Sequence, residues 1–478
     1  MNGLSQKRYL ELPLPTEDDP RSDQQRILDS LAAAGVEERV HIPVHILRQL
    51  YPLLDNAKWK ITVSLAWNGE NWEMVEIEEG DTTAQHYGLA VDLGSTTVVA
   101  RLLDCNSGEI LEEVSCFNKQ IQWGTDILSR IFYCKDNREK LEEVRRATVE
   151  SICECMDKLD ASHSALSMVI AGNTTMIHFL LGMDAFCVFY TPHAVHADRP
   201  GFQLARDLDI PLKGYVYCYP AKSNYLGGDI ISGMIDTELY KKNEISVFFD
   251  IGTNGELVIG NKEFLLCGAG AAGPALEGGV VRTGMRAEAG AVDEVKIRDG
   301  NIYVHVIGSH KEDSGSHEKN SGNHEDNSSG EEPQGICGSG IIDLIAELFL
   351  EGWIDIRGKF STEKSPLIQE RDNQLCVEYA PGLYFYQKDI DEFIRTKSAA
   401  HTMVEIMLRE SGLDLDQADR FYVAGAFGKH VSKESAITIG MYPDMDRDHI
   451  INAGNSSLEG AQKLLLNRSL LTDIDQIL

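Results

Sequence analysis

Two short glycine turns carry the residue types that bind a phosphate tail. Each begins with an aspartate, has a glycine two residues later, and continues with hydroxyl or amide side chains: Asp92, Gly94, Ser95, Thr96 and Thr97 in the first, and Asp250, Gly252, Thr253, Asn254 and Gly255 in the second. Glycines let backbone N–H groups approach phosphate oxygens, and hydroxyls donate further hydrogen bonds. Carboxylates hold a divalent cation, usually through water. The sequence therefore predicts that both turns bind the β- and γ-phosphates of ATP together with Mg²⁺.

Asp92 and Asp250 are the predicted catalytic and metal-holding residues. In phosphoryl transfer a protein mainly positions groups and neutralises charge, and Asp250 is the better candidate to orient water. A single Asp-Gly turn between strands is more often just a hairpin. Two turns with the same flanks favour phosphate binding, and their separation indicates an internal repeat with two similar lobes and a cleft between them.

Three further glycine turns add candidate nucleotide contacts. Gly172, Asn173 and Thr174 precede one expected helix, and Gly338 and Ser339 precede another. Helix capping and tight helix packing would explain such small residues. The functional alternative is that these helices cross at the hinge between the lobes, where bulky residues would block closure. The third turn follows a buried strand and suits a flat adenine base; its residues are Gly425, Ala426, Phe427 and Gly428. The P-loop pattern GxxxxGK[ST] does not occur, which argues against a P-loop fold.

The hydrophobic pattern predicts the elements that hold these turns. We expect strands at residues 168–171, 245–251 and 421–424, and helices at 140–159, 336–351 and 398–411. Ahead of them, a helix and two strands joined by an Asn-Gly turn suffice for a small α/β domain, with expected ranges 44–53, 58–67 and 72–78.

Four regions follow from these elements. They are a linker-like segment at 1–40, a small α/β domain at 41–86, a first lobe at 87–244 and a second lobe at 245–478. Residues 309–334 contain no aliphatic or aromatic side chain, so we predict a disordered surface insertion in the second lobe.

Composition excludes several classes of protein. The 478 residues carry a net charge of −31, which argues against nucleic acid or an anionic membrane as a partner. We find no signal peptide and no run of about 18 apolar residues that could span a bilayer. Ten cysteines without a CxxC pattern predict reduced thiols in a cytoplasmic protein.

The strings VDLGSTT, IAGNTTM, DIGTNGEL, ICGSGIID and VAGAFG resemble those of the acetate/sugar kinase, heat-shock chaperone and actin superfamily, known as ASKHA. Within it, the chain is most similar to the ATP-dependent reductive activators of corrinoid proteins. That resemblance starts near residue 8 and rests on the YLELPLPTEDDPRSD linker and on GNTTM, IGTNGELVIGNK, AAGPALEG, GMRAEAGAV, QKDI and AGAFG.

The resemblance implies an α/β fold: a two-lobed actin-like ATPase with duplicated ribonuclease H-like lobes, preceded by a small α/β domain. It also implies that ATP drives the reduction of Co(II) to Co(I) in a corrinoid bound to a partner protein. Relatives in this family are typically dimers, so we expect a homodimer.

The positions of the cysteines depart from the family pattern. The family usually carries a cysteine-rich iron–sulfur domain before the linker or at the C-terminus, whereas Met1 precedes the linker by a few residues and the last cysteine is Cys376. We therefore expect no iron–sulfur cluster in this chain and an external ferredoxin-like electron donor. Cys267 and Cys337 are the candidates for a cluster shared between subunits, without a CxxC-like context. Two alternatives stay open: a chaperone-like module that binds a corrinoid protein without electron transfer, and a small-molecule kinase of the same superfamily.

Overall fold

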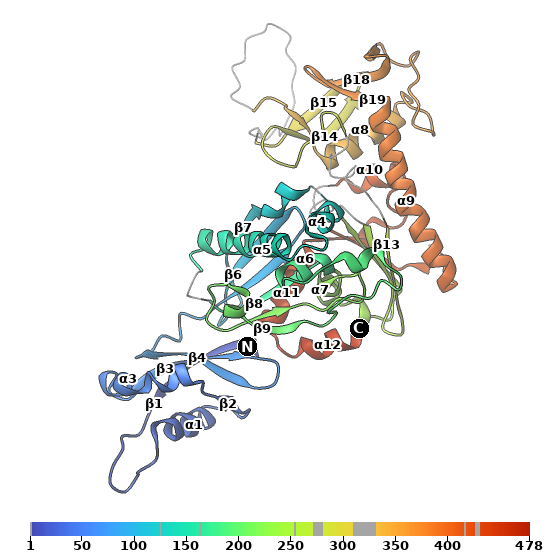
Figure 1. Ribbon diagram of the computed structural model, residues 1–478. Coiled ribbons are helices and arrows are strands. Elements are labelled where there is room, and N and C mark those ends of the chain that lie inside the picture. The colour runs from blue at the N-terminus through green and yellow to red at the C-terminus, as the bar shows by residue number, and fades with distance from the viewer. Residues whose placement is uncertain are drawn as a thin grey trace, which may run out of the picture. The chain divides into compact units, whose positions relative to one another are not determined.

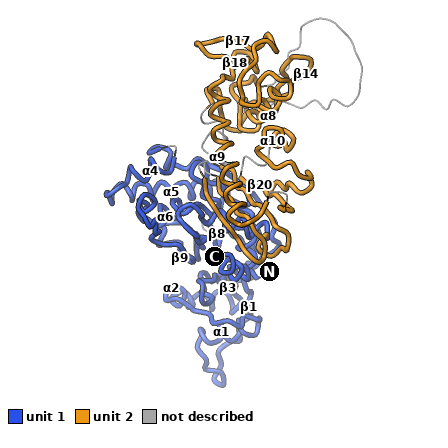
Figure 2. Tube along the Cα trace, turned by 90° about the vertical axis from the view of Figure 1, so that its right-hand side faces the viewer, with its two compact units in different colours: residues 1–238, 455–478 blue, residues 239–454 orange. Residues whose placement is uncertain are grey.

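A computed structural model describes residues 2–124, 126–161, 165–252, 255–270, 281–308, 331–414, 417–425 and 431–478 (Figure 1). The chain forms two compact units, which Figure 2 colours separately. Unit 1 consists of residues 1–238 and 455–478, and unit 2 of residues 239–454.

The N-terminal part of unit 1 is a four-stranded sheet with three short helices. The strands follow the order β1-β3-β4-β2, with β1, β3 and β4 antiparallel and β2 parallel to β4. Their bounds are β1 (Ser5–Glu11), β2 (Val40–His41), β3 (Lys60–Trp67) and β4 (Trp72–Glu79), and the helices are α1 (Asp23–Ala33), α2 (Val44–Leu47) and α3 (Leu50–Asn56).

The linker-like segment at 1–40 contributes β1 and α1 to this small domain. Its Leu10, Ile27 and Leu31 are buried in the same apolar core as residues of β3 and β4. The single helix expected at 44–53 is two helices. The helical path is interrupted at Tyr51, near the start of α3, where the backbone is extended (φ −112°, ψ 127°). Tyr51 precedes a proline, and a residue in that position disfavours the helical conformation.

A six-stranded sheet forms the rest of unit 1, in the order β7-β6-β5-β8-β10-β9. Its strands are β5 (Tyr87–Leu93), β6 (Thr97–Asp104), β7 (Ile110–Phe117), β8 (Ala165–Gly172), β9 (Gly201–Leu204) and β10 (Tyr215–Cys218). Its helices are α4 (Ile127–Cys134), α5 (Arg138–Lys158), α6 (Thr174–Leu180), α7 (Gly228–Thr237), α11 (Ser456–Leu466) and α12 (Leu470–Ile477), with 3₁₀ turns at Lys119–Trp123, Phe186–Phe189 and Ala205–Leu208.

Unit 2 is built on a five-stranded sheet in the order β13-β12-β11-β20-β21. These strands are β11 (Ser246–Ile251), β12 (Gly255–Gly260), β13 (Leu265–Gly270), β20 (Arg420–Ala424) and β21 (Ile450–Gly454). Two three-stranded sheets accompany it, made of β14 (Ala291–Arg298), β15 (Asn301–Val306) and β16 (Gly335–Ile336), and of β17 (Ile368–Arg371), β18 (Gln374–Ala380) and β19 (Leu383–Tyr386). The helices are α8 (Gly338–Leu350), α9 (Gln387–Ser411) and α10 (Lys433–Thr438), with 3₁₀ turns at Leu239–Lys241 and Arg447–His449.

The two large sheets share one topology. In each, three antiparallel strands (β7-β6-β5 and β13-β12-β11) are continued by two parallel ones (β8-β10 and β20-β21). The α/β fold class with a duplicated lobe, expected from the paired glycine turns, is thereby confirmed.

The end of the chain lies in unit 1, although the second lobe was expected to run to residue 478. Helix α11 packs on α7, where Tyr219 Oη donates to the Gly460 carbonyl (2.9 Å) and Ser232 Oγ donates to the Ser457 carbonyl (2.6 Å). A Cβ at Gly460 would overlap the Ser232 carbonyl oxygen. The two helix backbones therefore touch, which only a glycine permits.

Helix α9 begins eleven residues before the expected start at residue 398. The Asp389 carboxylate accepts a hydrogen bond from the Tyr386 backbone N–H (2.9 Å), which closes the first turn at Gln387. Residues 309–330 of the expected insertion lie outside the described residues. None of the helices in the described ranges has the length and apolarity of a transmembrane span.

The close crossing of α7 and α11 predicts an unusual effect of Gly460→Ala. Alanine normally stabilises a helix interior by about 0.5–1 kcal/mol relative to glycine. Here it should lower the free energy of unfolding by about 1–3 kcal/mol because the new methyl group forces the helices apart. Urea unfolding measures this difference, and Gln476→Ala on the exposed face of α12 is the control with little expected effect. A stabilised Gly460→Ala protein would contradict the packing.

Candidate functional site

The first glycine turn joins the carboxyl end of β5 to the start of β6 in the unit 1 sheet. Leu93 pairs with Val98, so residues 94–97 form the connection. A Cβ at Gly94 would overlap the Thr97 carbonyl oxygen, so the turn closes this tightly only with glycine. The turn expected from the sequence at Gly94–Thr97 is therefore present, with Asp92 two residues before it.

The Asp92 carboxylate is held by the start of α11. Asn455 Nδ2 donates to one carboxylate oxygen and Ser457 Oγ donates to the other, each at 2.9 Å. Burial raises the pKa of Asp92, and these two hydrogen bonds oppose the rise. The carboxylate is thus fixed in orientation by residues that sequence reasoning did not assign to the site. Asn455 also caps α11 by accepting from Leu458 N (3.0 Å).

Asp229 is a second carboxylate at this edge of unit 1, and sequence reasoning missed it. It lies in the first turn of α7, where Ile230 N donates to its Oδ1 (2.9 Å). Burial raises its pKa to about 7, and the negative charge of nearby Asp92 contributes to the rise. The signal that could have found it is Gly227-Gly228-Asp229, a glycine pair and an aspartate at a helix start.

The turn after β8 reaches the same edge. β5 and β8 are parallel with Leu93 opposite Gly172, and a Cβ at Gly172 would come within 2.9 Å of the Leu93 carbonyl oxygen. A Cβ on Gly227 would lie 2.5 Å from Asn173 Cα. Asn173 and the start of α7 are therefore in direct contact.

The side chains of this second turn serve the fold locally. Asn173 Oδ1 caps α6 by accepting from Thr175 N (2.9 Å) and Met176 N (3.2 Å). Thr174 Oγ1 donates to the Ser223 carbonyl (2.7 Å). Capping therefore accounts for Asn173, and the hydrogen bond of Thr174 joins the start of α6 to the segment at Ser223. A role of both residues in nucleotide binding stays a prediction.

A buried arginine, Arg130, donates a hydrogen bond to the backbone of the first turn. The Arg130 guanidinium, on α4, donates to the carbonyls of Ser95 (2.6 Å) and Gly124 (3.0 Å) and to Gln120 Oε1 (3.0 Å). All three acceptors are neutral, and among the described residues no carboxylate forms an ion pair with Arg130. Burial lowers the pKa of Arg130 to about 10, with Asp126 the nearby carboxylate that opposes the shift. The turn therefore has a buried positive charge beside it.

In unit 2, Asp250 is the last residue but one of β11, just before the second turn. Ile251 pairs with Gly255 across the β11–β12 hairpin, so residues 252–254 form the connection. Gly425 follows β20 with φ +92°, and a Cβ there would come within 2.5 Å of the Ile251 carbonyl oxygen and 2.8 Å of Asp250 Oδ1. The structure thus brings Gly425 to Asp250. Of the other predicted residues of these two turns, Thr253, Asn254, Ala426, Phe427 and Gly428 lie outside the described residues.

Gly338 and Ser339 form the buried first turn of α8. Ser339 Oγ lies 3.3 Å from Cys337 Sγ, and a Cβ at the neighbouring Gly340 would overlap the Val292 carbonyl oxygen of β14. Tight packing of α8 on β14 accounts for the small residues of this turn. Their contact with a nucleotide remains a prediction.

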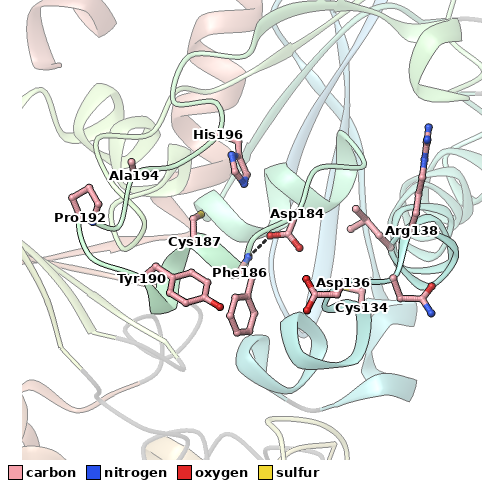
Figure 3. Close-up of a pocket in the computed structure, with 12 residues that line it drawn as sticks. Cys134, Asp136, Arg138, Asp184, Phe186, Cys187, Tyr190, Pro192, Ala194 and His196 are labelled. Carbon is pink, nitrogen blue, oxygen red and sulfur yellow. Dashed lines mark hydrogen bonds between the residues drawn. The ribbon is translucent and has the colours of Figure 1, made fainter.

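Two pockets lie elsewhere in unit 1. One, of about 610 Å³, is lined by residues that include Cys134, Asp184, Phe186, Cys187 and His196 (Figure 3). The other, of about 470 Å³, adjoins it at Arg138 and Leu141. Neither includes a residue of the predicted phosphate turns.

The donor set at the first turn fits Mg²⁺ bound through water. Asp92 offers hard carboxylate oxygens, which Mg²⁺ prefers, and Mg²⁺ keeps several water ligands where the protein supplies one or two carboxylates. Within the described ranges no group of three or more His, Cys, Asp or Glu side chains is placed to hold a metal by itself. All ten cysteines are described and none forms a disulfide; Cys267 lies in β13 and Cys337 caps α8.

The duplicated sheets with paired glycine turns define an ASKHA-type protein, and comparison with known families agrees. The C-terminal domain of RACo, described as the ASKHA domain, matches residues 244–478. The RACo middle region matches residues 87–242, and the RACo linker region matches residues 1–84. The chain belongs to the RACo family of reductive activators of corrinoid proteins.

Individual relatives agree with this assignment. A solved reductive activator for corrinoid, iron-sulfur protein superposes with a TM-score of 0.88 and 34% identity over 100% of this chain and 75% of that one. The corrinoid activation enzyme RamQ of Eubacterium limosum is 30% identical over 405 residues, which are 80% of this chain and 64% of RamQ. The [Co(II) methylated amine-specific corrinoid protein] reductase of Methanosarcina barkeri is 25% identical over 82% of this chain and 72% of its own length. The chain thus spans less than two thirds of RamQ.

The contacts of Arg130 predict the effect of removing it. Arg130→Met keeps the apolar stem but leaves the Ser95 and Gly124 carbonyls without their donor, so the free energy of unfolding should fall by about 2 kcal/mol or more. Urea unfolding measures it, and Arg138→Met, at an exposed position of α5, is the matched control. Equal stability of both variants would contradict a supporting role for Arg130.

Proposed function

We propose that this protein couples ATP hydrolysis to the reduction of a corrinoid protein from Co(II) to Co(I), with an electron from an external ferredoxin-like donor. The observation that carries the proposal is the match of the whole chain to a reductive activator for corrinoid, iron-sulfur protein. The names of two further relatives, a corrinoid activation enzyme and a Co(II) corrinoid protein reductase, support the same activity. We further propose that the protein works in the cytoplasm as a homodimer.

The two glycine turns bind the phosphates of ATP in this proposal. Backbone N–H groups of residues 94–97 and 252–255 contact the β- and γ-phosphates, and Asp92 and Asp250 hold Mg²⁺ through water. When bound, Mg²⁺ would supply neutralisation of the charge on the phosphates. The turn at 425–428 lies against the adenine base. The tight closure of Gly94 and the approach of Gly425 to Asp250 support these assignments.

Asp229 acts as the general base in this proposal, while Asp250 orients the attacking water. A base works best when its pKa lies near the working pH, and the pKa of Asp229 is about 7. Asp92, which receives two hydrogen bonds, is the carboxylate assigned to electrostatic support. Two neighbouring carboxylates with different environments commonly divide the roles of base and electrostatic support.

This assignment predicts a pH dependence. ATP hydrolysis should rise with pH through about 7, because Asp229 accepts a proton only when it is ionised. Asp229→Asn should lower kcat by about 10²–10⁴-fold and remove that dependence. The control is Asp236→Asn on the same helix, where the carboxylate pairs with Lys463. A kcat that keeps its pH profile in Asp229→Asn would exclude Asp229 as the base.

ATP is needed if the electron transfer to Co(II) is uphill. Moving a two-state equilibrium from 1:99 to 99:1 takes about 5.5 kcal/mol. For one electron, about 1.4 kcal/mol corresponds to about 59 mV, so a nucleotide-driven change of that size offsets about 240 mV.

A reconstituted reduction tests the proposal directly. The protein is mixed with MgATP, a reduced ferredoxin and a Co(II) corrinoid protein, and the visible spectrum is followed. We expect Co(I) to form only with ATP, and we expect Asp92→Ala and Asp250→Ala to abolish both ATP hydrolysis and reduction with the fold preserved by circular dichroism. Unchanged ATP turnover in both variants would contradict the phosphate-binding assignment. Corrinoid protein binding without reduction would instead support a chaperone-like module.

A small-molecule kinase of the same fold is the second candidate. Asp229 favours it, because a kinase needs a carboxylate base near the γ-phosphate and its raised pKa suits that task. ATP turnover stimulated by a metabolite, without any effect on Co(II) corrinoid, would support this alternative.

A further inference from the structure

Two cysteine thiols lie in contact beneath the first glycine turn. Cys116 is in β7, the edge strand of the unit 1 sheet, and Cys155 is in α5, which packs on that strand. The Cys155 thiol donates to Cys116 Sγ, with the two sulfur atoms 3.2 Å apart. A disulfide bond is about 2.05 Å long, so about 1.2 Å of approach would join them.

We propose that Cys116 and Cys155 form an oxidisable dithiol that a peroxide converts into a reversible disulfide. The Cys116 sulfur attacks the peroxide O–O bond, which gives a sulfenic acid and releases one water from hydrogen peroxide. The Cys155 sulfur then displaces the sulfenic hydroxyl, and a second water leaves. Two thiols and one peroxide thus give one disulfide and two waters, and an added dithiol reductant reverses the change by exchange.

The surroundings favour Cys116 as the first sulfur to react. Both thiols are buried. The hydrogen bond from Cys155 lowers the pKa of Cys116 although burial opposes this shift, and Lys158 and Lys119 contribute to the lowering. The hydrogen bond to Cys116 and burial raise the pKa of Cys155. The thiolate is the reactive form of cysteine. Cys153, on the same helix, has no cysteine partner among the hydrogen bonds of the described residues, and burial raises its pKa.

The pair is connected to the predicted phosphate turn by Asn118, two residues after Cys116. Asn118 Nδ2 donates to the Gly94 carbonyl (2.9 Å), and Asn118 N donates to the Thr96 carbonyl (2.9 Å). Ser151 of α5 ties the same strand end to the helix, since its carbonyl accepts from Cys116 Sγ (3.2 Å) and its Oγ accepts from Lys119 N (3.0 Å).

Joining Cys116 to α5 therefore displaces the strand end that holds this turn, and nucleotide hydrolysis falls. This second step rests on the proposed function, whereas formation of the disulfide does not.

Peptide mapping tests the disulfide itself. The protein is treated with hydrogen peroxide, its remaining thiols are alkylated, and it is cleaved with trypsin without reductant. The expected product joins the peptides 102–119 and 147–158, each alkylated at its other cysteine, and is two hydrogen masses lighter than the sum of these two alkylated peptides. Each peptide holds a second cysteine, so Cys105→Ser and Cys153→Ser must keep the cross-link while Cys116→Ser and Cys155→Ser lose it. Absence of the cross-link, or its persistence in Cys155→Ser, would overturn the proposal.

ATP hydrolysis by the same samples tests the connection to the turn. We expect oxidation to lower the wild-type rate at least about tenfold, because displacement of a catalytic group by about 1 Å is enough for such a loss. Reduction should restore the rate, and Cys155→Ala should be insensitive to peroxide while Cys153→Ser behaves as wild type. A cross-linked protein with an unchanged rate would overturn the connection. If the untreated protein hydrolyses no ATP, the proposed function fails while the peptide map still decides the disulfide.

Discussion

The buried carboxylate of Asp92 connects the first glycine turn to the segment with which the chain returns to unit 1. A carboxylate removed from water is costly unless hydrogen bonds replace its hydration. Its two donors, Asn455 and Ser457, come more than 360 residues later in the chain. The chain must therefore return from unit 2 to unit 1 at residue 455, and the small residues of the α7–α11 crossing allow that return. Gly460 is the position where the two backbones come closest.

The duplicated sheet explains why two similar turns exist. In each large sheet an antiparallel hairpin places its glycine turn next to the end of a parallel strand: Leu93 lies opposite Gly172 in unit 1, and Asp250 lies opposite Ala424 in unit 2. The neighbours of the two aspartates differ, however. Asp92 is held by a returning helix, while Asp250 is approached by Gly425 on the neighbouring strand end. One topology thus gives the two aspartates different surroundings, which suits distinct roles for the two carboxylates.

The first turn has a positive charge beside it, although the protein as a whole is strongly acidic. A net charge of −31 repels a polyphosphate, so a phosphate site in such a chain relies on backbone N–H groups, a divalent cation and local positive charge. Arg130 supplies positive charge next to the turn, where its guanidinium donates to the Ser95 carbonyl, and all its hydrogen bonds go to neutral acceptors. No carboxylate in the described ranges forms an ion pair with Arg130, so a salt bridge does not neutralise its charge.

The sequence by itself determined the local features of this protein. The glycine turns at Asp92 and Asp250 follow from residue types and alternating strands, and the repeat between them predicted the duplicated sheet. Helix α5 and strands β8, β11 and β20 lie within a few residues of their expected bounds.

Only the tertiary structure brought Asn455, Ser457 and Asp229 to Asp92, assigned the last helices to unit 1, and placed Cys116 against Cys155. These contacts join residues far apart in the chain, so no local spacing encodes them. Their effects on pKa come from burial and neighbouring charge, which exist only once the chain is folded.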